Sequence, residues 1–130
     1  MLTAYRALWE ARTRTYAKAE LDPAVARHAA NTALSNVKLT LAYYQDHGTV
    51  MRGTPRIAPK VTAVNTTAKP AKAVLTDCVD TRDYTEVNRK TGKKVPVGDG
   101  PRRHVYNATA VRVDGSWRIW TTTIERDRTC

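Results

Sequence analysis

Phenylalanine is absent from this 130-residue sequence, and glycine and proline are scarce, with six residues each. No run of apolar residues approaches the roughly 18 that a membrane-spanning helix needs. A secretory signal is also missing, so we expect any exported form to have lost its signal or anchor. These absences exclude a membrane-spanning chain and a low-complexity one. Three tryptophans and six tyrosines must supply the aromatic bulk of the core, and the length predicts a single domain over residues 1–130.

Cysteine is nearly absent too, because only Cys78 and Cys130 occur, and neither has the spacing of a metal ligand. The three histidines are scattered, so we expect no metal site and no cofactor. In an oxidising compartment the two cysteines predict a disulfide that closes a loop of about 50 residues and contributes about 4 kcal/mol. Such a disulfide predicts an extracellular or cell-envelope location. Two free thiols would instead indicate the cytoplasm.

Acidic residues are the minority, with 12 against 22 lysines and arginines, which gives a formal net charge of +10. The basic residues are spread along the chain, and no helix-turn-helix signature, zinc spacing or ribonucleoprotein motif accompanies them, so nucleic acid is not an expected partner. One local concentration flanks Thr91-Gly92 and is a candidate contact for an anionic partner. A solvated hairpin tip is the simpler interpretation. The four cations are Arg89, Lys90, Lys93 and Lys94.

Helical periodicity dominates the first third of the chain. Residues 2–18 carry bulky side chains at steps of three and four, which predicts an amphipathic helix. Asp22-Pro23 predicts the start of a short second helix. A third helix is expected to be capped by Asn31 or Thr32 and to end at Gly48.

After residue 48 the pattern changes to that of strands. Residues 50–65 contain two prolines and predict one edge strand or two short strands, and residues 71–79 predict another. We expect residues 84–87 and 93–97 to pair as a small hairpin. Residues 104–113 and 116–125 predict a tight hairpin around Asp114-Gly115. In its second strand, Trp117 and Ile119 would occupy one face and Trp120 and Ile124 the other, which predicts a central strand or one covered on both sides.

Helices followed by antiparallel strands predict an α+β fold, in which the sheet curls round the first helix and leaves a cavity. This order, with Tyr5-Arg6-Ala7-Leu8-Trp9 in the first helix and the closing Asp-Gly hairpin, resembles the nuclear transport factor 2-like (ketosteroid isomerase-like) superfamily over nearly the whole chain. More narrowly, four segments look like a group of uncharacterised secreted or lipid-anchored actinobacterial proteins. The resemblance implies a cone-shaped fold with a pocket between helices and sheet. The segments are Gly53-Thr54-Pro55, Asp77-Cys78-Val79-Asp80, Thr91-Gly92-Lys93 and Arg126-Asp127-Arg128-Thr129-Cys130.

Enzymes of that superfamily place a carboxylate base and hydrogen-bond donors such as tyrosine in the pocket. By position, Tyr16 would be a donor. Asp77 and Asp80 lie on opposite faces of a strand, so at most one of them enters the pocket. Aromatic residues could line the cavity for a flat or greasy ligand, although core packing uses the same side chains. The pocket-lining candidates are Tyr5, Trp9, Tyr16, Tyr43, Asp77, Tyr106 and Trp120, and none is assigned as catalytic.

The function favoured by this resemblance is a non-catalytic exported binding or accessory domain. Its expected partner is a small apolar ligand or an envelope protein, and a homodimer through the exposed sheet face is expected by analogy. Two alternatives stay open. One is an isomerase- or dehydratase-type enzyme that uses the pocket, and the other is an extracytoplasmic scaffold domain of a conjugation or secretion apparatus.

Overall fold

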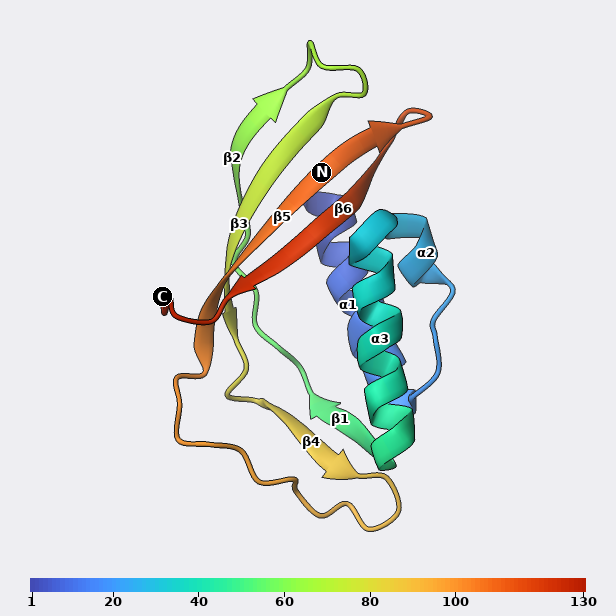
Figure 1. Cartoon of the computed structure of the whole chain (residues 1–130), viewed down its shortest axis with the longest axis vertical. Coiled ribbons are helices and arrows are strands. Elements are labelled where there is room, and N and C mark those ends of the chain that lie inside the picture. Colours follow the sequence, from blue (N-terminus) through green and yellow to red (C-terminus); the bar gives the residue numbers. More distant parts are fainter.

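The computed structural model describes residues 1–130 and confirms the α+β class: three helices come first and six strands follow (Figure 1). The helices lie together on one side of a curved four-stranded sheet, while its other side carries no helix. The core lies between these layers, where bulky side chains from α1 meet inward-facing residues of the sheet such as Leu75 and Ile119. The helices are α1 (Leu2–Lys18), α2 (Ala24–His28) and α3 (Asn31–His47).

The helix ends follow local sequence signals with two departures. Asp22 accepts a hydrogen bond from the Ala24 N–H at 2.8 Å, but Pro23 is the cap and α2 begins one residue later than expected. No side chain caps α3, so the expected capping role of Asn31 or Thr32 is wrong. The Thr32 hydroxyl instead faces the Trp120 carbonyl, at 3.4 Å. Gly48 ends α3 in the left-handed conformation, as predicted.

Two antiparallel sheets follow the helices. A two-stranded ribbon joins β1 (Thr49–Gly53) and β4 (Tyr84–Asn88). The larger sheet has the order β2-β3-β5-β6, and its strands are β2 (Lys60–Asn65), β3 (Lys72–Asp80), β5 (Arg103–Val113) and β6 (Ser116–Glu125).

The predicted hairpin between residues 84–87 and 93–97 is present only in reduced form: the Asn88 N–H donates to the Lys93 carbonyl at 2.8 Å and the Val95 N–H to the Glu86 carbonyl at 3.0 Å, but no second strand forms. β4 pairs over its whole length with β1, and the segment after the Thr91-Gly92 turn makes only an isolated bridge between Val87 and Lys94. Pro96 lacks an N–H and therefore weakens a ladder on that side. A strand distant in sequence offers β4 a complete partner, which local pattern does not reveal.

The closing hairpin is present as predicted, with Asp114 and Gly115 both at positive φ, as a tight two-residue turn requires. The register shifts within it: Ala110 pairs with Ile119 and Thr109 with Thr121, which leaves Trp120 unpaired in a bulge. The bulge reverses the alternation of the residues after it.

Because of this bulge, Ile124 reaches the helix-facing side of the sheet together with Ile119, so their expected placement on opposite faces is wrong. β6 is also an edge strand with β5 as its only strand partner, so a central position is wrong. α3 packs against it on the helix side.

Candidate functional site

A pocket of about 330 Å³ lies between α1, α3 and the helix-facing side of β5 and β6. This volume is at the lower end of the range for small-molecule sites. Its apolar wall includes Leu8, Val37 and Ile124, and exposed residues of α3 and the chain after β6 form its mouth. No aspartate or glutamate lines it. The polar lining residues are Arg12, Asn36, Thr40, Tyr106, Thr122 and Arg126.

Regular spacing in each element brings these residues together. Leu8 and Arg12 lie one turn apart on the same face of α1, while Val37 and Thr40 share a face of α3. Alternation along β5 turns Tyr106 toward the helices. The pocket therefore depends on three separate segments of the chain.

Arg12 is a half-buried cation without a countercharge. Its guanidinium carbon lies 4.1 Å from the centroid of the Trp9 ring and 5.7 Å from that of Tyr16. Its Nε has no hydrogen-bond partner and is buried, as is the unpartnered Tyr16 hydroxyl. The five ion pairs of the structure all involve other arginines.

The tyrosines that surround Arg12 do not neutralise it. Burial raises the pKa of the hydroxyls of Tyr44, Tyr84 and Tyr106 above their ordinary value. These hydroxyls therefore stay protonated and uncharged at physiological pH. The stacking of Arg12 on Trp9 offsets part of the cost of its burial, but no negative charge accompanies it.

Tyr5 and Asp77 form a buried pair away from this pocket. The Tyr5 hydroxyl donates to Asp77 Oδ2 at 2.6 Å, and the Ala58 N–H donates to Oδ1 at 2.6 Å. Burial, reinforced by the Asp77 carboxylate, raises the pKa of Tyr5, so its proton stays on the phenol. Asp77 is only 2% exposed, and both of its oxygens are occupied. The pair ties α1 to β3 and to the segment before β2.

Of the seven pocket candidates from the sequence, only Tyr106 lines the pocket beside Arg12. Trp9 and Tyr16 are buried beneath the Arg12 guanidinium. Tyr43 is 43% exposed on α3, and its ring lies 4.1 Å from that of His47. Trp120 lies in the bulge and faces a groove on the other side of the sheet, with Thr109 and Val111 among its neighbours. Sequence alternation does not reveal that bulge.

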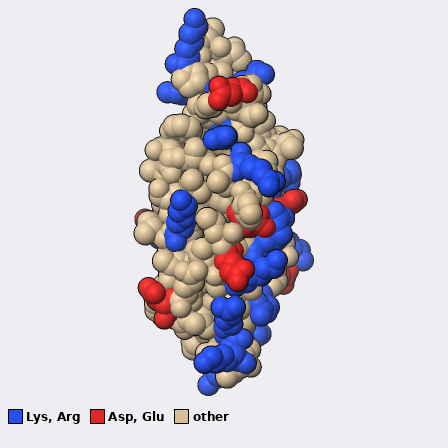
Figure 2. All heavy atoms as spheres, turned by 90° about the vertical axis from the view of Figure 1, so that its right-hand side faces the viewer, with Lys and Arg blue, Asp and Glu red and all other residues tan.

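On the helical face of the molecule, basic side chains do not gather into one patch. Figure 2 shows them along one side of the helical face from its middle to its lower end and again at the top, with acidic side chains among them. The four cations after β4 are all exposed, and none forms an ion pair. The Asn88 carboxamide accepts hydrogen bonds from the N–H groups of Lys90 and Thr91 and holds their turn. A role for Arg89, Lys90, Lys93 and Lys94 in binding an anionic partner stays a prediction.

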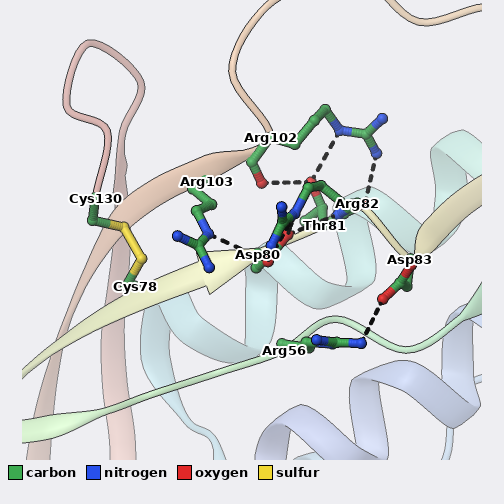
Figure 3. A network of polar contacts seen from close by, with 9 residues as sticks. All are labelled: Arg56, Cys78, Asp80, Thr81, Arg82, Asp83, Arg102, Arg103 and Cys130. Carbon is green, nitrogen blue, oxygen red and sulfur yellow. Dashed lines mark hydrogen bonds and ion pairs between the residues drawn. A yellow bond between two sulfur atoms is a disulfide. The ribbon is translucent and has the colours of Figure 1, made fainter.

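Asp80 is the centre of a separate polar network at the end of β3 (Figure 3). Both oxygens of its carboxylate accept hydrogen bonds from the Arg82 guanidinium, the shortest of them 2.6 Å long. Arg103 donates a further hydrogen bond at 3.3 Å. Arg102 donates to the carbonyls of Thr81 and Tyr84 on the adjoining turn. The network therefore uses arginines to secure the chain reversal after β3.

The Asp80 network predicts an acid-sensitive contribution to stability. Hydrogen bonds from the Arg82 side chain and backbone, followed by the Arg103 contact, hold the pKa of Asp80 well below its usual range. A lowered pKa in the folded state stabilises the fold above about pH 4 and loses that effect as the pH falls through the folded value. Between pH 5 and pH 2, the free energy of unfolding measured in urea is expected to fall more steeply for the wild type than for Asp80→Asn. Parallel curves would contradict this assignment.

The predicted disulfide is present and lies near this network (Figure 3). It joins Cys78 in β3 to Cys130 at the end of the chain, with 5.9 Å between the Cα atoms. The Val105 N–H donates to the Arg128 carbonyl at 3.2 Å, so the terminal segment is also held by the backbone. The bridge fastens the C-terminal segment to the side of the sheet opposite the helices.

Arg12 and Arg126 are functional candidates that sequence reasoning missed. The available signal was Arg12 itself, which occupies the bulky stripe of α1 together with Leu8 and Tyr16. An arginine in such a stripe must be buried or must reach a polar cavity. No comparable signal marks Arg126, because its place at the pocket mouth depends on how the strands pack.

Comparisons with known proteins show the fold and no family. No protein-family model matches the chain, and no curated protein matches it. None of the three helices combines the length and the hydrophobicity of a membrane-spanning segment. Among solved structures, the chain is similar to the intermembrane space region of the chloroplast protein ARC6, with a TM-score of 0.55 and 10% sequence identity, over 94% of this chain and 91% of that one. This similarity shows a shared α+β arrangement, and membership of the nuclear transport factor 2-like superfamily stays a prediction.

Proposed function

We propose that this chain is a non-catalytic, extracytoplasmic binding domain of the nuclear transport factor 2-like type, and that its ligand is a small molecule held between the helices and the sheet. The observation that carries this proposal is the pocket of about 330 Å³ beside Arg12. Such pockets usually hold ligands through an apolar wall and a few placed polar groups, and this one has both.

The chemistry of the pocket supports binding over catalysis. General acid–base chemistry of the superfamily type needs a carboxylate within reach of the ligand. Both oxygens of the buried Asp77 are occupied by Tyr5 and Ala58, and Asp80 is engaged by arginines. The Cys78–Cys130 disulfide supports an oxidising, extracytoplasmic location, because such bridges persist there.

The proposal predicts that a side chain large enough to fill the pocket abolishes binding. Thr40 lines the pocket and is half-buried on α3, so Thr40→Trp is expected to occupy the space without entering the core. A fragment library is screened by ¹⁵N-NMR against the wild type. Fragments are expected to shift amides around Leu8, Val37 and Ile124, and Thr40→Trp is expected to lose at least tenfold in affinity.

Ala42→Trp is the matched control, because Ala42 lies on the same helix, is exposed and does not line the pocket. This variant should bind fragments as the wild type does. Fragments that bind equally well to Thr40→Trp, or a library without any hit at the pocket, would overturn the proposed function.

A further inference from the structure

The charge of the pocket selects among ligands. Its lining includes Arg12 and Arg126 and no acidic residue. Glu125, which is adjacent in sequence to Arg126, is engaged elsewhere: its Oε2 accepts from Asn107 at 2.8 Å and pairs with Arg128 at 3.0 Å. The two pocket arginines therefore have no carboxylate partner within the chain.

Arg12 is the more informative of the two, because its position is costly in the unliganded protein. A buried donor without an acceptor and a cation without a countercharge both oppose folding. Nε of Arg12 is such a donor, and the hydroxyls of Tyr44, Tyr84 and Tyr106 around it stay protonated. Stacking on Trp9 fixes the guanidinium plane at the edge of the pocket and offsets only part of this cost. An anion in the pocket would supply the missing countercharge at the accessible part of the guanidinium.

The walls of the pocket restrict the anion further. A guanidinium presents a planar fork of donors that matches a carboxylate. Thr40 and Thr122 line the same space and carry hydroxyls, which can donate to an oxygen, while Leu8, Val37 and Ile124 offer an apolar surface. A fully hydrated inorganic ion would leave that surface unused.

From these observations we infer that the ligand is a small amphiphilic carboxylate, with its charged group on Arg12 and Arg126 and its apolar part against Leu8, Val37 and Ile124. This inference rests on the proposed function of the pocket. It adds an anionic group to the small apolar ligand that the sequence led us to expect.

The test compares octanoate with octanamide, which has the same shape and no charge. Each is titrated into the wild-type protein at low ionic strength and followed by isothermal calorimetry, with ¹⁵N-NMR to locate the binding site. Octanoate is expected to bind at least tenfold more tightly than octanamide. Arg12→Gln is expected to weaken octanoate binding by roughly 10- to 100-fold and to leave octanamide binding nearly unchanged, because it removes a charge-assisted contact.

Arg6→Gln is the matched control, because this substitution removes the same net charge. Arg6 is an exposed residue of the same helix, does not line this pocket and forms no ion pair. It should change octanoate affinity by less than about twofold, because exposed charges are screened. Should Arg12→Gln fail to fold, Arg126→Gln at the exposed mouth provides the same comparison, with an expected loss of about three- to tenfold in octanoate affinity.

The ratio of the octanoate affinity to the octanamide affinity tests the carboxylate ligand separately from the proposed binding function. If octanamide binds the pocket as tightly as octanoate and neither arginine variant changes that ratio, the anionic ligand is overturned while the proposed function stands. If neither compound nor any library fragment shifts the pocket amides, both are overturned. A ratio that falls toward one in Arg12→Gln, but not in Arg6→Gln, supports the carboxylate ligand.

Discussion

Replacing both Cys78 and Cys130 with serine is expected to lower the free energy of unfolding by about 4 kcal/mol. The two residues are 52 positions apart, and the bridge reduces the conformational entropy of the unfolded chain over that loop. The loss is large for a chain of 130 residues, because the total stability of folded proteins is about 5–15 kcal/mol. Urea unfolding of the oxidised wild type and of the double variant measures the difference.

Reduction provides the control for the disulfide prediction. Dithiothreitol should bring the wild type close to the stability of the double variant and should leave the double variant unchanged. Hydrogen exchange should increase first at Val105, whose N–H bonds to the terminal segment, and much less in α1. A loss below about 1 kcal/mol would mean that backbone contacts of the terminal segment replace the bridge.

Asp77→Ala is expected to destabilise the protein by about 3 kcal/mol, the second large effect. The substitution leaves the buried Tyr5 hydroxyl without an acceptor, and it also removes the acceptor of the N–H of Ala58, which is an exposed residue. Each unsatisfied buried donor costs about 1–3 kcal/mol. Thermal and urea unfolding measure the loss, while circular dichroism checks that the fold is retained.

Three further variants show whether the loss of the Tyr5–Asp77 contact causes the destabilisation. Tyr5→Phe removes only the hydroxyl, and the double variant with Asp77→Ala should be less destabilised than the sum of the two single changes. Asp83→Ala breaks the exposed Arg56 pair and should cost less than about 1 kcal/mol. Additive effects of Tyr5→Phe and Asp77→Ala would contradict the coupling.

The charged groups Asp77, Asp80 and Arg12 differ in whether they have a polar partner within the chain. Asp77 and Asp80 both have partners within the chain, and both support the fold. Arg12 has none, and it lines a pocket. Charged groups that pair with other groups of the chain stabilise the fold, whereas a charged group without such a partner can bind a ligand. This difference is why the inference about function rests on the arginine and not on the aspartates.

Sequence alone determined the features that depend on neighbours along the chain. The bulky stripe of α1, the end of α3 at Gly48 and the closing turn at Asp114-Gly115 all follow from local conformational preference, and each is present. The α+β class follows from the order of these elements.

Only the tertiary structure decided the contacts between distant segments. β4 pairs with β1 because a complete strand is available there, and the bulge at Trp120 turns Ile124 toward the helices. Arg12 has no countercharge because no acidic side chain of α3, β5 or β6 reaches the pocket, which the spacing of residues within α1 does not determine. Periodicity assigns a side chain to a face of its own element, but packing decides what that face meets.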